Sequence, residues 1–117
     1  MSKTYIRIYC NDFKVRSTGN RSWYRKKVLD ELLLDKDLNM IIPYPISEEK
    51  AIILSERLKN YAFNVPTYEE NVFKVELVRS TNNGKKILKS IVLPIILRST
   101  GEFVFYEKVN IKGERYG

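Results

Sequence analysis

A cluster of basic side chains near the predicted start of the first helix is the densest group able to bind an anion. Six cations with two aromatic rings among them make up this cluster: Lys14, Arg16, Arg21, Trp23, Tyr24, Arg25, Lys26 and Lys27. Positive charge at a helix N-terminus opposes the helix dipole by about 0.3–1 kcal/mol per residue. Free backbone N–H groups at that position bind phosphate, and Trp23 could stack on a base or a sugar. The cluster therefore predicts phosphate or nucleic-acid binding. A solvated helix face paired with the acidic middle of the chain is the alternative.

The outward face of the first predicted strand is a second candidate site. Tyr5, Arg7 and Tyr9 alternate with apolar residues and so share one face. Two aromatic rings flanking an arginine resemble the sheet surfaces on which single-stranded nucleic acid stacks. A helix covering that face is the alternative interpretation, because tyrosine is often half-buried in strands.

Three lysines near the predicted hairpin form a third basic group, Lys85, Lys86 and Lys89, with Arg79 and Arg98 nearby in the pattern. They could extend a basic surface across the sheet. Lysines also protect exposed strand edges against aggregation, which is the simpler explanation for any one of them.

The residue types present exclude the common catalytic and metal sites. The chain has no histidine and one cysteine, Cys10, which excludes Ser-His-Asp triads, Cys-His dyads, a His/Cys zinc site and an internal disulfide. Glu48, Glu49 and Lys50 contain the Glu-x-Lys element of some metal-dependent nucleases, but helix capping explains the two carboxylates. Ser17–Asn20 lacks the Lys-Ser/Thr of a phosphate-binding loop. We therefore expect no enzymatic activity, no metal and no cofactor.

Charge is segregated along the chain. Of 117 residues, 21 are basic and 14 acidic, a net charge of +7. Residues 1–29, 30–70 and 71–117 carry net charges of +7, −5 and +5 respectively. Basic ends suit a polyanion, and they could also dock on the acidic middle of a second copy or of another protein. The expected partners are nucleic acid of unspecified type, or alternatively a homo-oligomer or a protein.

Hydrophobic periodicity and turn signals divide the chain into elements. The pattern predicts strands at 3–10, 40–42, 73–78, 85–99 and 102–112, helices at 21–36 and 47–61, an exposed loop at 11–20, and a flexible tail at 112–117. Ser47 is the predicted N-cap of the second helix. Asn82-Asn83-Gly84 predicts a type I′ hairpin turn, since these residues tolerate positive φ angles. Pro94 predicts a bulge or an edge, because proline cannot donate to a strand ladder.

These elements predict a single α+β domain spanning residues 1–117. Its two helices pack on one face of a mostly antiparallel sheet in the order β-α-(β)-α-β-β-β. No segment approaches the roughly 18 apolar residues of a membrane span and no signal peptide is evident, so we expect a cytoplasmic protein without membrane contact. The abundance of Ile, Lys, Asn and Tyr is typical of an AT-rich genome. The absence of glutamine and histidine, with abundant Lys and Glu, fits a thermophilic archaeal or viral source, whereas the many asparagines argue against extreme heat.

The leading functional hypothesis from the sequence is a small, non-catalytic nucleic-acid-binding protein. The first helix and the preceding loop would contact phosphates, and Trp23, Tyr5 or Tyr9 would stack on bases. The alternative is a protein-interaction module, such as a subunit, an inhibitor or a self-assembling component, that uses the segregated charges.

Overall fold

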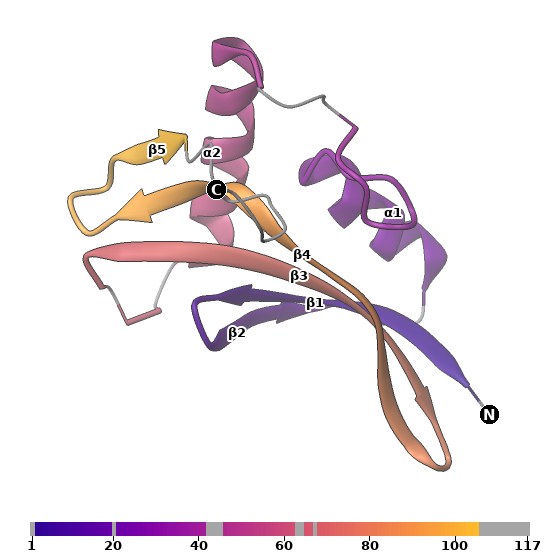
Figure 1. The fold of residues 1–117 in the computed structure, drawn as a ribbon. Coiled ribbons are helices and arrows are strands. Elements are labelled where there is room, and N and C mark those ends of the chain that lie inside the picture. The colour runs from indigo at the N-terminus through magenta and orange to yellow at the C-terminus, as the bar shows by residue number, and fades with distance from the viewer. Residues whose placement is uncertain (1, 20, 42–45, 63–64, 67, 106–117) are drawn as a thin grey trace, which may run out of the picture.

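The fold is one antiparallel sheet with two helices on one side of it (Figure 1). The computed structural model describes residues 2–19, 21–41, 46–62, 65–66 and 68–105. The elements are β1 (Lys3–Cys10), β2 (Phe13–Ser17), α1 (Ser22–Glu31), α2 (Glu48–Ala62), β3 (Glu70–Thr81), β4 (Gly84–Arg98) and β5 (Phe103–Phe105). The strands lie in the order β2-β1-β3-β4-β5. The predicted α+β class is confirmed.

The core lies between the helices and the sheet face that they cover. Strand β1 alternates as predicted, with Ile6, Ile8 and Cys10 buried on the helix side and the whole strand paired with β3. Burial raises the pKa of the Cys10 thiol, so the group is neutral. All the main elements except β2 and β5 contribute fully buried side chains, among them Ile6, Ile8, Val28, Leu54, Leu58, Phe73, Val75, Leu93 and Ile95. The sheet face opposite the helices carries the odd-numbered residues of β1.

Strand β2 lies in the segment predicted to be an exposed loop, so that prediction is wrong for Phe13–Ser17. Strand β2 pairs antiparallel with β1 through a turn at Asn11 and Asp12. Asn11 has a φ of 56°, a left-handed conformation that asparagine tolerates. Its Nδ2 donates to Asn71 Oδ1 (3.0 Å), and its Oδ1 accepts from the Val72 N–H (2.9 Å), which ties the turn to β3.

Helix α1 ends at Glu31, before the predicted end at residue 36. Leu33 adopts a φ of 58°, which a right-handed helix does not allow. Leu34 and Met40 then form an isolated antiparallel bridge, and Asp35 Oδ1 accepts two backbone N–H groups in the intervening loop (2.8 and 2.9 Å). The strand predicted at 40–42 is therefore reduced to this bridge at Met40, and residue 42 lies outside the described part of the chain.

Helix α2 confirms the predicted second helix and its cap. The Lys50 N–H donates to Ser47 Oγ at 3.3 Å, in the first turn of the helix. Leu54, Leu58 and Tyr61 are buried, as their helical spacing predicts.

Replacing the cap tests this local account. We expect Ser47→Ala to lower the free energy of unfolding by about 1 kcal/mol, because the first turn loses its side-chain acceptor. Ser47→Asp should retain the stability of the wild type, since aspartate accepts the same hydrogen bond. Guanidinium denaturation measures both variants, and equal stability of Ser47→Ala and wild type would show that the cap contributes nothing.

Strands β3 and β4 form a long hairpin at the predicted position. Thr81 pairs with Gly84 across the turn. The predicted type I′ geometry is wrong, because Gly84 alone among the turn residues has a positive φ (123°), whereas Asn82 and Asn83 do not. Glycine therefore takes the one turn conformation that other residues adopt poorly.

Pro94 lies in a bulge of β4, which confirms that prediction. Val72 pairs with Ile96 and Lys74 pairs with Val92, so three residues of β4 oppose Phe73 alone. The missing proline N–H is tolerated because regular pairing is interrupted at this position.

The observed element order is β-β-α-α-β-β-β, which differs from the predicted β-α-(β)-α-β-β-β by the addition of β2 and the loss of the short middle strand. Of the last predicted strand, residues 103–105 form β5; residues 106–112 and the predicted tail lie outside the described residues. In the described ranges, neither helix is long and apolar enough to cross a bilayer.

Candidate nucleic-acid interface

A basic hollow of about 290 Å³ lies on the sheet face that the helices leave open. It is lined by Lys3, Tyr5, Arg7, Lys14, Ser17, Thr18, Gly19, Ser80 and Lys85. Among the described residues, its ionisable lining consists of four cations and one tyrosine, with no carboxylate. We call it the open-face hollow; it suits an anion by both charge and hydrogen-bonding capacity.

Strand pairing brings these distant lysines together. Lys3 pairs with Ser80 of β3, and Ser80 pairs in turn with Lys85 of β4. Lys14 of β2 pairs with Tyr9 of β1, on the same face. Figure 1 shows the N-terminal end of β1 beside the β3–β4 hairpin. Lys3 was not singled out in the sequence, although it lies two residues before Tyr5 and so shares the Tyr5 face.

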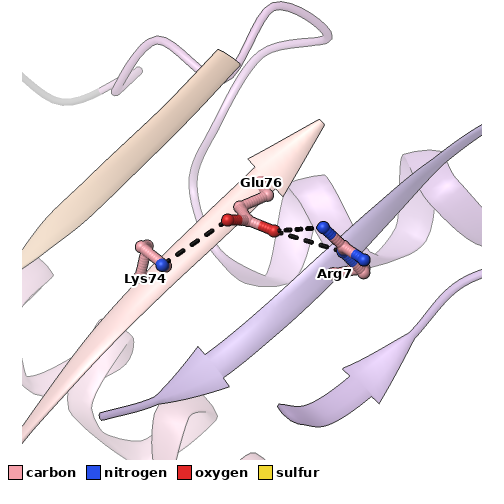
Figure 2. A network of polar contacts seen from close by, with 3 residues as sticks. All are labelled: Arg7, Lys74 and Glu76. Carbon is pink, nitrogen blue, oxygen red and sulfur yellow. Dashed lines mark hydrogen bonds and ion pairs between the residues drawn. The ribbon is translucent and has the colours of Figure 1, made fainter. Parts of the chain in front are cut away.

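Arg7 is held on this face by a nearly buried carboxylate (Figure 2). Its Nη2 and Nε donate to Glu76 Oε1 at 2.8 and 3.1 Å. Lys74 Nζ lies 3.5 Å from the other oxygen of Glu76. The Glu76 side chain is 7% exposed and those of Arg7 and Lys74 are 19% and 36% exposed, so two cations surround one carboxylate. The Arg7–Glu76–Lys74 group therefore carries a net positive charge and holds the Arg7 side chain in the lining of the open-face hollow.

The two tyrosines of the predicted stacking platform offer little free ring surface. Tyr5 is buried. The Tyr9 ring is flanked by Lys74 Nζ at 4.8 Å and by the Arg7 guanidinium at 5.8 Å from its centroid. Burial, followed by the charge of Glu76, raises the pKa of Tyr9. Base stacking at these rings stays a prediction.

A second, smaller hollow of about 180 Å³ lies at the N-terminus of α1. It is lined by Ser2, Thr4, Arg21, Ser22 and Arg25, and we call it the helix hollow. Arg21 is the N-cap residue and its side chain makes no capping hydrogen bond; no acidic residue occupies the first turn. Neither Arg21 nor Arg25 forms an ion pair with a residue that the structure describes. Cations at this end destabilise the isolated helix, and they favour a bound anion.

The two hollows lie on opposite faces of the same end of β1. Lys3 and Tyr5 line the open-face hollow, whereas Ser2 and Thr4 line the helix hollow. Successive residues of a strand point to opposite faces. Residues 17–19 line the open-face hollow, and Arg21 and Ser22 line the helix hollow. Basic groups therefore surround this end of the strand on both faces.

Arg16 is separated from Lys14 by a bulge. Lys14 pairs with Tyr9 but Arg16 pairs with Ile8, so the two side chains lie on opposite faces in spite of their spacing of two. Arg16 extends over the Tyr61 ring (4.9 Å to the centroid) on the helix side. The Arg16 side chain therefore lies on the face of the sheet opposite the open-face hollow.

The environment of Arg16 is a polar cluster that joins β2 to both helices. Its Nη1 lies 4.0 Å from Glu31 Oε1, and the Tyr61 hydroxyl donates to the same Glu31 oxygen. Burial, and then the hydrogen bond to Glu31, raise the pKa of Tyr61. Arg57 Nη1 donates to the Asp30 and Glu31 carbonyl oxygens at the end of α1 (2.8 and 3.2 Å). These contacts hold α1 against α2 and give Arg16 a structural role.

The remaining residues of the basic cluster lie on the outer surface of α1. Trp23, Lys26 and Lys27 are exposed, and Lys26 Nζ lies 3.4 Å from Asp30 Oδ2 one turn along the helix. An exposed i,i+4 pair contributes little to stability. The three side chains are therefore accessible to a ligand.

The third basic group is divided between two ends of the sheet. Lys85 joins the open-face hollow, Lys86 pairs with Arg79 nearby, and Lys89 Nζ donates to Asn39 Oδ1 (2.5 Å). Arg98 lies at the other end, 3.9 Å from Glu70. That other end also carries the acidic residues Asp12, Glu69 and Glu102, mixed with Lys14 and Lys74, which both pair with Tyr9. We call it the acidic end of the sheet, and we call the end at Lys3 and Lys85 the basic end.

Comparisons with family models, with curated proteins and with solved structures give no match for this chain. Among the residues that the structure describes, no group of three or more carboxylate and thiol side chains is arranged to hold a metal ion.

Proposed function

We propose that this protein binds nucleic acid through its basic end, without catalysis and without strong sequence specificity. The observation that carries the proposal is the open-face hollow, where four cations from three strands converge with no carboxylate among the lining residues. Contacts of this kind bind the phosphate backbone, which is common to all sequences.

The helix hollow supports the same proposal independently. Arg21 and Arg25 supply charge, Ser22 supplies a hydroxyl, and the first turn of α1 supplies backbone N–H groups. A phosphate chain that follows the end of β1 would contact both hollows. Lys26 and Lys27 extend the positive surface along α1.

Binding to labelled oligonucleotides tests the proposal. Fluorescence anisotropy with single- and double-stranded DNA and RNA should give micromolar or tighter affinity at ~50 mM salt. The affinity should fall roughly 10²- to 10³-fold at ~200 mM salt, because about six phosphate contacts release condensed counterions. No binding to any probe, or an affinity that ignores ionic strength, would refute the proposal.

The separation of charge between the ends of the sheet favours one second candidate, a self-assembling or partner-binding module. Lys3 and Lys85 lie at one end, and Glu69, Glu70 and Glu102 at the other, so copies could associate head to tail. Light scattering on nucleic-acid-free protein distinguishes the two candidates. An oligomer that dissociates as salt is raised would favour self-assembly, and a monomer at every salt concentration would exclude it.

A further inference from the structure

Helix α1 presents an exposed pair of aromatic rings beside the basic residues. The Trp23 and Tyr24 rings are stacked, with centroids 4.6 Å apart and planes within 8° of parallel. Trp23 is 59% exposed and Tyr24 is 40% exposed, so neither ring belongs to the core. Single exposed apolar residues are common on protein surfaces, whereas adjacent exposed rings form a continuous apolar patch of the kind that marks interaction sites.

A shallow hollow of about 370 Å³ adjoins the Trp23 ring. Lys26, Lys27 and Arg57 line it together with Asp30 and Glu31. Both carboxylates already have partners. Lys26 forms an ion pair with Asp30, and Arg16 and the Tyr61 hydroxyl contact Glu31. The ring therefore adjoins a hollow whose unpaired charge is positive.

These neighbours favour a nucleobase over a protein surface as the group that covers Trp23. Protein interfaces are depleted of lysine around their aromatic anchors, whereas two lysines line this hollow. Proteins that bind single strands combine a basic track for the backbone with aromatic rings for the bases. In a duplex the base faces are already stacked on one another, so only an unpaired base could cover the ring.

We infer that this protein binds single-stranded nucleic acid in preference to a duplex, with one base stacked on the exposed face of Trp23 and adjacent phosphates in contact with Arg21, Arg25 and Lys27. This inference rests on the proposed function, since it specifies the ligand of the same basic end. Tyr24 supports the ring from behind, so the stack is formed before the base arrives.

The intrinsic fluorescence of the protein tests the inference, because Trp23 is its only tryptophan. Unlabelled single-stranded oligothymidylate should quench this fluorescence. An abasic strand of equal length and a duplex should bind in anisotropy experiments without comparable quenching. Equal quenching by the abasic strand and oligothymidylate, or binding of oligothymidylate without quenching, would overturn the stacking inference and leave the proposed function intact. Absence of binding in every arm would refute the proposed function itself.

Substitutions separate stacking from a structural role. Trp23→Ala should weaken single-strand binding about 5- to 150-fold, which corresponds to the loss of one stacked base, and should change duplex binding less than about twofold. Trp23→Phe should retain most of the affinity. Tyr68→Ala is the matched control, since Tyr68 is an aromatic residue of similar exposure (50%) outside the basic end. Equal losses for single strand and duplex, or for Trp23→Ala and Tyr68→Ala, would contradict the inference.

Discussion

Replacing Lys3, Lys14 and Lys85 together by glutamate is expected to weaken nucleic-acid binding by roughly 100-fold. The slope of log Kd against the logarithm of the salt concentration should fall by about three, one for each lysine. The three lysines come from β1, β2 and β4 and line the open-face hollow. Each is exposed, and none forms an ion pair within the described residues. Their replacement therefore changes phosphate contacts with little effect on folding, and the melting temperature should stay close to that of the wild type.

A control variant separates the position of the charges from their number. Lys36→Glu, Lys50→Glu and Lys59→Glu change the net charge by the same amount, but these exposed residues lie outside both hollows. This variant should keep most of the affinity, because exposed charges beyond about 10 Å are screened at ~0.1 M salt. Equal losses in the two triple variants would show that net charge alone drives binding, which would contradict an assigned site.

Removing the Glu76 carboxylate is expected to have the largest effect on stability. Glu76→Leu should lower the free energy of unfolding by about 3 kcal/mol, since it leaves Arg7 and Lys74 facing each other without their shared counter-charge. We expect the lower end of the range for buried pairs because both cations are partly exposed. A loss of this size is a large part of the stability of a small domain.

A second substitution should recover most of that loss. Arg7→Met combined with Glu76→Leu replaces the buried ion pair by apolar side chains of similar size, a change that is often neutral. Urea denaturation of the wild type, both single variants and the double variant completes the cycle. If the double variant loses the sum of the two single effects, the charges act independently and the account of the Arg7–Glu76–Lys74 group is wrong.

The parts of the fold that the sequence predicted correctly are those with strong local signals. The alternation around Ile6 and Ile8, the cap at Ser47 and the proline at position 94 each act within a few residues, and each appears in the structure as expected. Strand β2 was missed because its alternation of Phe13 and Val15 with Lys14 and Arg16 spans only four residues of an otherwise polar segment. The hydrogen bonds from Asn11 to β3 that fix its turn are long-range.

The candidate site was predictable in composition but not in geometry. Lys14 and Arg16 differ by two in sequence, and alternation alone would place them on one face; the bulge opposite Ile8 and Tyr9 separates them. Lys3 and Lys85 are far apart in sequence and meet only through the shared register with Ser80. Long-range pairing of this kind leaves no local pattern, so the open-face hollow could be found only in the folded chain.

The central claim is that nucleic acid binds across the two hollows and the outer surface of α1. An amide NMR titration of isotope-labelled protein with a single-stranded oligonucleotide tests it most directly. We expect the largest shift changes at residues 2–5, 17–19, 21–27 and 84–86, with small changes in α2 and at the acidic end of the sheet. Largest changes in α2 or around Glu69 and Glu70, or no change at saturating oligonucleotide, would contradict the account.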